Sequence, residues 1–122
     1  MPDPTDPGPG PGPAIEVGIE VEIAVLTAAF DARPAAEESV LAALSRYVVL
    51  TRHEPACRNV DLVASLTHPG RFLVIEKWES AADVRAHLDS PLMAEMAKAV
   101  VASLTTKPAI DLYDSISAHD LA

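Results

Sequence analysis

Hydrophobic and polar residues alternate strictly in the stretch IEVGIEVEIAV, from Ile15 to Val25. A period of two residues is typical of a β-strand, because successive side chains of a strand point to opposite faces of the sheet. The overlapping stretch IAVLTAAF is apolar on both faces. The pattern therefore predicts a first strand that begins at Ile15 and becomes buried on both sides towards its end.

The stretch RPAAEESVLAALSRYVVLTRHEP changes to helical spacing. Pro34 suits a first helical turn, Glu37 suits the positive N-terminal end of a helix, and Pro55 stops the helix. Apolar residues recur every three or four positions, which predicts a helix with one buried face. That face is expected to carry Val40, Leu41, Leu44, Tyr47 and Val48.

Two strands and a turn are predicted next. CRNVDLVASL alternates, with apolar residues on one face from Val60 to Leu66, and THPGR is typical of a turn. FLVIEKW is apolar on both faces, and Phe72, Val74 and Trp78 share one of them. This pattern predicts a second strand that is buried on both sides.

The remaining segment predicts an interrupted helix and a last strand. Ser80 and Asp83 form an S-x-x-D pattern, which favours the start of a helix that runs to about Leu88. Ser90 and the proline after it suit the cap and first position of a second helical piece. That piece is expected to end near Leu104, and AIDLYDSI then predicts a strand.

The predicted order is β-α-β-β-α-β, which is the ferredoxin-like arrangement of an α+β fold. We expect a four-stranded antiparallel sheet with the helices on one face and the first and third strands at its centre. Apolar residues on the uncovered face predict a homodimer that pairs sheet against sheet. We expect this domain to span residues 15–117, between a disordered Pro/Gly-rich tail at 1–14 and a short tail at 118–122.

Composition narrows the classes of function. The 122 residues include 18 acidic and 9 basic side chains, for a formal charge of −9, which argues against binding to nucleic acid or to anionic membranes. No segment approaches the roughly 20 apolar residues of a membrane span. The N-terminus lacks the basic start and apolar core of a secretory signal, so we expect a cytoplasmic protein.

No cofactor or metal is expected from the motifs. Cys57 is the single cysteine, which excludes an internal disulfide and a multi-cysteine zinc site and favours a packed thiol over a nucleophile. No G-x-G-x-x-G follows a strand. The histidines are far apart and lack H-x-x-x-H spacing; they are His53, His68, His87 and His119.

Three stretches resemble the antibiotic biosynthesis monooxygenase family: EPACRNVDLV, PGRFLVIEKWES and AHLDSPLM. The family pattern is E-P-G-C, a strand, P-x-R-[FY], a strand that ends in W-E-S, and a helix with A-H-x-x-S-P. The match covers about residues 20–117. The resemblance implies a dimeric α/β barrel, with two ferredoxin-like subunits facing sheet to sheet and pockets between helices and sheet.

Members of this family include cofactor-independent monooxygenases of phenols or hydroquinones, and others resemble quinol oxidisers, small-sugar-phosphate isomerases or haem degraders. The haem-degrading branch needs an axial histidine, which aligns near Met96, and an asparagine, which aligns near Ala24. No histidine occurs from Leu92 to Leu104, and the first strand contains no asparagine. Methionine would be an unusual axial ligand here, so haem cleavage is disfavoured.

Cofactor-independent oxygenation needs little from the protein. An electron-rich phenol loses a proton to a base and its anion passes an electron to O₂, so a dry cavity, a base and hydrogen bonds suffice. Our leading hypothesis is a monooxygenase that oxidises a phenolic or quinol-like small molecule, with a small aromatic substrate and O₂ as partners. Two alternatives stay open: an isomerase of a small oxo-compound, or a non-catalytic ligand-binding dimer.

His87 and Glu76 are the candidate catalytic residues. The intrinsic pKa of a histidine suits a base near neutral pH, although a histidine at a helix end also commonly faces solvent. Glu76 lies on an apolar strand, so its carboxyl group has to be paired, in a cavity or at a dimer interface. Either residue is also the proton shuttle of the isomerase alternative.

The candidate substrate-binding residues are Trp78, Tyr47, Met96 and His53. Trp78 is equally suited to the core, and Met96 to filling gaps between helix and sheet. The hydroxyl group of Tyr47 needs a partner on an apolar helix face, and a substrate oxygen is one option. His53 near the end of the first helix also suits the negative end of the helix dipole.

Overall fold

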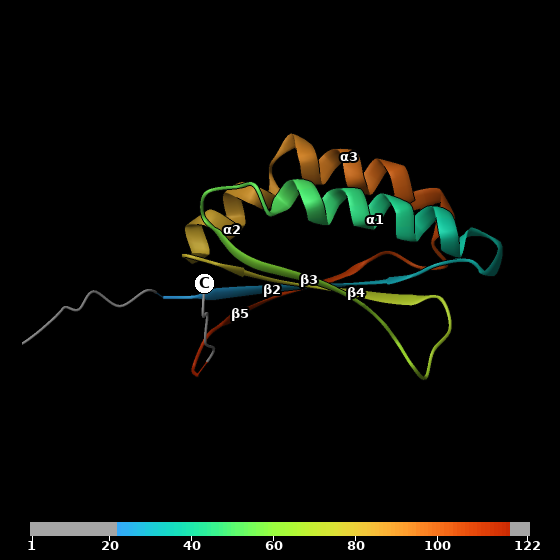
Figure 1. Ribbon diagram of the computed structural model, residues 1–122, viewed down its shortest axis with the longest axis horizontal. Coiled ribbons are helices and arrows are strands. Elements are labelled where there is room, and N and C mark those ends of the chain that lie inside the picture. Colours follow the sequence, from blue (N-terminus) through green and yellow to red (C-terminus); the bar gives the residue numbers. More distant parts are fainter. Residues whose placement is uncertain (1–21, 118–122) are drawn as a thin grey trace, which may run out of the picture.

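A computed structural model of the protein describes residues 22–117, which form a sheet covered on one face by helices (Figure 1). The strands are β2 (Ala24–Asp31), β3 (Cys57–Ala64), β4 (Arg71–Trp78) and β5 (Ala109–Asp114). The α-helices are α1 (Glu37–Thr51), α2 (Ala81–Leu88) and α3 (Pro91–Val100), and the 3-10 turns are η2 (Pro34–Ala36) and η3 (Val101–Ser103).

The sheet is antiparallel and has the order β3-β4-β2-β5, which confirms the predicted ferredoxin-like arrangement. The two central strands, β2 and β4, are the first and third of the sheet, as their two-sided apolar pattern predicts. They pair without a break from Ala24 opposite Trp78 to Asp31 opposite Arg71. This pairing places the helix-facing residues of both strands side by side.

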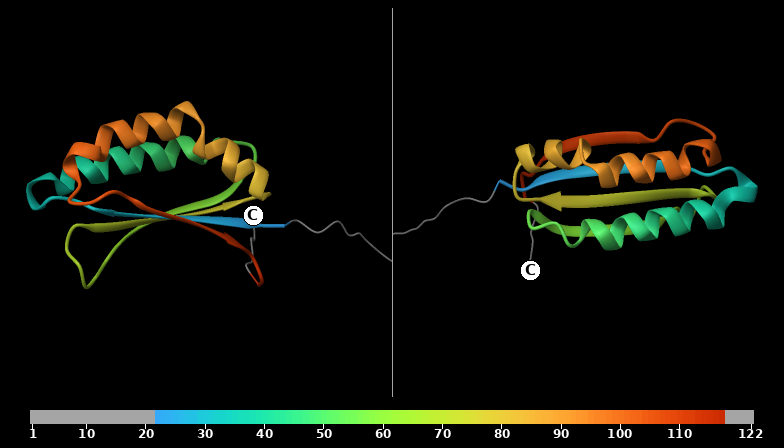
Figure 2. Two further views of the ribbon diagram at one scale, coloured as in Figure 1. Left: turned by 180° about the vertical axis from the view of Figure 1, so that it is seen from behind. Right: turned by 90° about the horizontal axis from the view of Figure 1, so that it is seen from above.

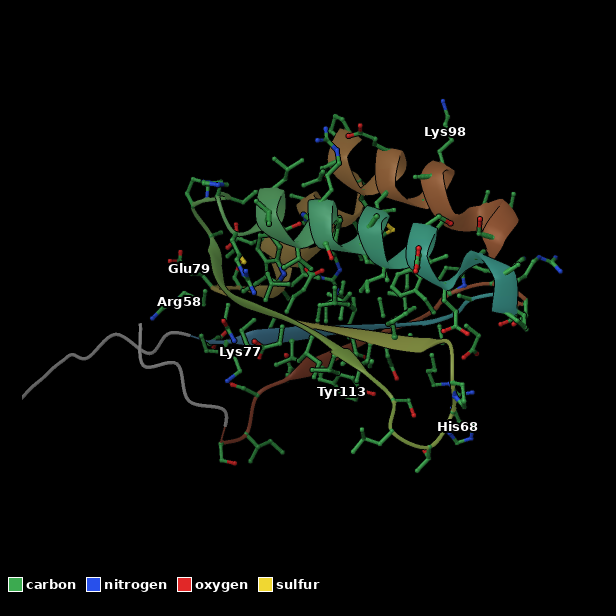
Figure 3. The ribbon with its side chains drawn as sticks, turned by 45° about the vertical axis from the view of Figure 1, so that its right-hand side comes forward. Arg58, His68, Lys77, Glu79, Lys98 and Tyr113 are labelled. Carbon is green, nitrogen blue, oxygen red and sulfur yellow. The ribbon has the colours of Figure 1, made fainter. Side chains whose placement is uncertain are left out.

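The helices cover only one face of the sheet. Seen from above, α1 and α3 run side by side and α2 lies over one end (Figure 2, right). The opposite face carries half-buried Leu73 and Ile75 at its centre, with Val63 and Tyr113 about half exposed nearer the edges. Tyr113 lies on the side of the sheet away from the helices, whereas Lys98 lies on the outer surface of α3 (Figure 3).

Three residues lie outside the predicted helix face or the predicted strands. Leu41 is 42 % exposed, because one step of about 100° along α1 takes it off the face that buries Val40 and Leu44. Leu66 and Ile116 are fully exposed, because β3 ends at Ala64 and β5 ends at Asp114 before the chain reaches them. Sequence alternation continues past the last residue that pairs in each strand.

The predicted start of the first strand, from Ile15 to Val21, lies outside the described residues, as do the tails predicted at 1–14 and 118–122. Within the described part, the first strand begins at Ala24 and its burial alternates to Asp31.

The predicted helix starts at Ser80 and Ser90 are confirmed. Ser80 Oγ accepts a hydrogen bond from the backbone N–H of Asp83 at 3.1 Å and donates one to Asp83 Oδ2 at 2.7 Å. Ser90 Oγ accepts from the backbone N–H of Met93 at 3.2 Å, with Pro91 as the first residue of α3. The two caps fix where α2 and α3 begin, and α2 carries His87.

Ser80→Ala is expected to lower the free energy of unfolding by about 1 kcal/mol, because the N–H of Asp83 loses its acceptor at a helix end. Ser80→Thr keeps a hydroxyl group that both accepts and donates at the same position and serves as the matched control. Urea unfolding followed by circular dichroism measures both variants. Equal stability of Ser80→Ala and the wild type would show that the cap contributes nothing.

Candidate functional site

Four polar or partly polar side chains meet in the interior between the helices and the sheet. Tyr47 comes from α1, Glu76 and Trp78 from β4, and His87 from α2. Glu76 is 0 % exposed, Trp78 1 %, and Tyr47 and His87 2 % each. Buried polar groups persist in folded proteins when they are hydrogen-bonded, so the contacts among these four residues, the buried cluster, define the candidate site.

The local sequence explains why these side chains point inward. Burial in β4 alternates, so Glu76 shares the helix-facing side of the strand with Val74 and Trp78. Tyr47 lies on the buried face of α1, three residues after Leu44. His87 lies three residues after Val84, and these two are the buried residues of α2.

Both oxygens of the Glu76 carboxyl group have hydrogen-bond donors. Tyr47 Oη donates to Glu76 Oε2 at 2.5 Å, and Trp78 Nε1 donates to Glu76 Oε1 at 2.8 Å. Of the three environments considered for this residue, the structure shows the paired one. Trp78 therefore has a polar role besides filling the core.

His87 is held through both of its ring nitrogens. Nε2 lies 2.6 Å from Tyr47 Oη, and Nδ1 lies 2.9 Å from Glu54 Oε2. The imidazole centroid is 4.6 Å from the ring centroid of Trp78 and 5.6 Å from that of Tyr47. The alternative that His87 faces solvent from a helix end is wrong, because α2 packs its last turn against the sheet.

Glu54 is the residue that the sequence analysis missed. It lies in the turn after α1, and a third of its side chain is exposed while Oε2 contacts His87. A charged residue before Pro55 resembles an ordinary turn residue. The only signal for it was its place at the head of the stretch EPACRNVDLV, which begins with the E-P of the family pattern.

Burial dominates the electrostatics of the cluster. Burial raises the pKa of Tyr47 far above its usual value, and the charge of Glu76 and the hydrogen bond to Glu76 add to the shift. Burial also raises the pKa of Glu76, although the hydrogen bonds from Tyr47 and Trp78 and the charge of His87 oppose it. Tyr47 therefore stays a phenol, and Glu76 binds a proton more readily than an exposed glutamate.

Two small polar side chains border the cluster. Burial, followed by the charge of Glu76, raises the pKa of the Cys57 thiol to about 11. Few thiolates form at neutral pH, which supports a packed thiol rather than a nucleophile. Thr51 Oγ1 is fully buried and forms no hydrogen bond of good geometry among residues 22–117, although it lies close enough to the Tyr47 hydroxyl group to oppose the rise in its pKa.

Met96 and Tyr47 line a shallow groove of about 60 Å³ between α1 and α3. The other lining residues are small or apolar, apart from exposed Arg46 and Glu95, which form an ion pair of 3.6 Å at the surface. Tyr47 belongs both to this groove and to the buried cluster. His53, in contrast, is exposed in the turn after α1, and the structure does not bring it to the cluster.

A second pocket of about 180 Å³ lies between α2 and the β2–β5 edge of the sheet, and no member of the cluster lines it. Trp78 lines neither of these two pockets; its ring centroid lies 4.6 Å from that of His87. Within residues 22–117 no group of three or more His, Cys, Asp or Glu side chains is arranged to hold a metal ion. No helix in that range is both long and apolar enough to cross a bilayer.

Comparison with known proteins decides the family. The model of the antibiotic biosynthesis monooxygenase family matches residues 23–99. The chain belongs to this family. The match spans the elements from β2 into α3, and so includes every residue of the buried cluster and Glu54.

Solved structures agree with this membership. A crystal structure of an antibiotic biosynthesis monooxygenase is 26% identical, with a TM-score of 0.71 over 77% of this chain and 99% of that one. Rv0793 from Mycobacterium tuberculosis is also 26% identical, with a TM-score of 0.73 over 79% and 97%. A conserved protein from Methanosarcina mazei shares the fold at 16% identity, with a TM-score of 0.71 over 76% and 92%. No curated protein matches the chain significantly.

Glu76→Gln is expected to gain stability relative to the wild type as the pH rises above 4.5, the ordinary value for a glutamate. Because the folded-state pKa is raised, the unfolded chain loses this proton first as the pH rises, which favours unfolding. The wild type thus holds this contribution below pH 4.5 and loses it as the pH rises through the folded pKa of Glu76, whereas glutamine does not titrate.

Urea unfolding of both proteins at a series of pH values above 4.5 measures this difference. Glu95→Gln removes an exposed carboxylate and controls for net charge. A difference between Glu76→Gln and the wild type that stays constant with pH would contradict the raised pKa.

Proposed function

We propose that the protein is a cofactor-independent monooxygenase that oxidises a phenolic or quinol-like small molecule with O₂. The observation that carries the proposal is the buried cluster, which places a carboxyl group, a phenol and an imidazole in mutual hydrogen-bond contact away from water. Membership of the antibiotic biosynthesis monooxygenase family supports it. A structure named for that activity is 26% identical over most of the chain.

In the proposed reaction the substrate supplies the electrons. Its phenolic O–H passes a proton to the cluster, the anion transfers one electron to O₂, and the two radicals join at a ring C–H carbon. The resulting peroxide then loses water as the carbon becomes a carbonyl. One oxygen atom enters the product, and the other leaves as water with the hydrogens of the former O–H and C–H bonds.

The cluster suits the proton transfers of this reaction. Glu76 and His87 are the bases, and Tyr47 connects them and contacts the substrate, because its side chain also lines the groove. Burial keeps water away from the anion and strengthens its interactions with hydrogen-bond donors. The cluster returns a proton to the peroxide when water is lost.

The substrate is proposed to enter by the groove between α1 and α3. The groove of about 60 Å³ is smaller than the roughly 150 Å³ cavity that holds a benzene molecule. Binding therefore requires side chains to move, and the unbranched side chain of Met96 is suited to such adjustment. Tyr47 and Met96 thus keep their predicted substrate-binding role, and exposed His53 does not.

We also propose a homodimer that pairs the uncovered faces of two sheets. That face carries Leu73 and Ile75 on the central strand β4, with Val25 and Ala29 beside them on β2. Thr27 and Asp61 pair with Ile75, and Lys77 pairs with Val25, so the apolar side chains of this face are mixed with polar ones. An uncovered sheet face with apolar residues on its central strands favours a partner, and a second copy presents the same surface around a two-fold axis.

His87→Ala is expected to lower oxygen uptake by about 100-fold or more, because the substrate loses a base and Tyr47 loses a partner. Uptake is measured with an oxygen electrode and a naphthalene diol as substrate. His68→Ala, in the exposed β3–β4 turn (Figure 3), is the matched control and is expected to keep wild-type activity. Circular dichroism checks that both variants fold.

The outcomes separate the candidate functions. Absence of oxygen uptake by the wild type across a panel of electron-rich phenols would overturn the proposal. Proton exchange into a small oxo-compound without oxygen uptake would point to the isomerase alternative. Full activity of His87→Ala would remove the buried cluster from the mechanism.

Ile75→Lys is expected to convert the dimer to a monomer, because a charge at the centre of the uncovered face has to be buried against its copy. Sedimentation velocity measures the mass in solution. Leu66→Lys adds the same charge at a fully exposed loop position and is expected to stay dimeric. A monomeric wild type, or a dimeric Ile75→Lys, would contradict this assembly.

A further inference from the structure

We propose that Glu54, His87, Tyr47 and Glu76 form a proton relay, in which Glu54 exchanges protons between solvent and the buried carboxyl group of Glu76. The relay is a property of the folded protein and does not depend on which reaction the protein catalyses. Its test therefore uses no substrate.

The geometry is an unbroken chain of three hydrogen bonds. Glu54 Oε2 lies 2.9 Å from His87 Nδ1, His87 Nε2 lies 2.6 Å from Tyr47 Oη, and Tyr47 Oη lies 2.5 Å from Glu76 Oε2. The groups come from the turn after α1, from α2, from α1 and from β4. Every inner member is at most 2 % exposed, whereas a third of the Glu54 side chain reaches the surface.

The number of protons in the three hydrogen bonds explains how a proton can move along the relay. Each of the three contacts needs one hydrogen, so the four groups share three protons and carry a net charge of −1. One of these protons has three possible positions: on Glu54, on His87 as an imidazolium, or on Glu76. In all three arrangements every contact keeps its hydrogen and Tyr47 stays neutral.

Transfer from Glu54 to Glu76 takes three short steps in the same direction. Glu54 gives its proton to His87 Nδ1, His87 Nε2 gives one to Tyr47 Oη, and Tyr47 gives its hydroxyl proton to Glu76 Oε2. No heavy atom has to change its partner. The raised pKa of Tyr47 rules out a standing phenolate, so Tyr47 passes protons without storing charge.

The other ionisable or polar groups around the relay do not offer a second exit. Trp78 Nε1 only donates, and it is bonded to the other oxygen of Glu76. Cys57 holds its proton, since its pKa is about 11. Arg52 donates to the backbone oxygen of Val60 at 2.8 Å, and a guanidinium group has no acceptor atom for a proton. Within the described residues, Glu54 is thus the carboxyl group that links the cluster to solvent.

Glu54→Gln tests this role, because glutamine can still accept a hydrogen bond from His87 Nδ1 but cannot take up a proton. The measurement is the solvent-exchange rate of the imidazole N–H protons of His87 and of the hydroxyl proton of Tyr47, by NMR. Glu54→Gln is expected to slow both by about 100-fold, a magnitude typical of losing a positioned acid–base group. Signals that are too broad in the wild type and sharpen in Glu54→Gln count as the same result.

Two references make the measurement decisive. The indole N–H of Trp78, the single tryptophan, has no place in the relay and exchanges only when the fold opens. Its rate is expected to be lower than that of the relay protons and to be unchanged in Glu54→Gln. Glu79→Gln removes a surface carboxylate that pairs with Arg58 at 3.9 Å (Figure 3), and is expected to change nothing.

The proposal is overturned by any of three results. The first is that the relay protons of the wild type exchange only as fast as the indole N–H of Trp78, so that opening of the fold is what releases them. The second is that Glu54→Gln leaves the exchange rates of the relay protons unchanged or their signals undetectable. The third is that Glu79→Gln slows this exchange as much as Glu54→Gln does. The first result needs only the wild type and holds even if a variant fails to fold. None of these results concerns oxygen uptake, so failure of the relay and failure of the proposed activity are separate outcomes.

Discussion

The hydrogen bond between Tyr47 and Glu76 is the interaction on which the interior depends. A carboxyl group at 0 % exposure is costly in a core of aliphatic side chains unless both of its oxygens find donors. Tyr47 satisfies one oxygen and Trp78 the other, which ties α1 to β4. His87 then satisfies the remaining capacity of the Tyr47 hydroxyl group and brings α2 to the same point. Three elements are thereby fixed around one side chain.

Much of the fold follows from local sequence patterns. Two-sided apolar runs identify β2 and β4 as central strands, and Ser80 and Ser90 locate the two helix starts because a cap acts within three residues. Two of the errors lie where the alternation of the sequence continues past the end of a strand. Leu66 continues the alternation of β3 but lies beyond its last paired residue, so nothing covers it.

The site is less accessible to such reasoning. The strand pattern places Glu76 and Trp78 on one face, and helical spacing puts Tyr47 inward. The contact between Glu54 and His87, however, joins residues 33 positions apart, and depends on the angle at which α2 packs on the sheet. A turn glutamate carries no periodic signal, so its partner becomes visible only when the chain is folded. The fold alone also leaves the chemistry open, which is why the arrangement of these side chains carries the functional proposal.

Trp78, the single tryptophan of the chain, lies within the buried cluster. Its indole ring lies 4.6 Å from the imidazole of His87 and is hydrogen-bonded to Glu76. The intrinsic tryptophan fluorescence of the protein thus comes from inside the cluster rather than from the surface. Fluorescence of the unlabelled protein therefore reports on the packing around Glu76 and His87, so the interior has an optical reporter of its own.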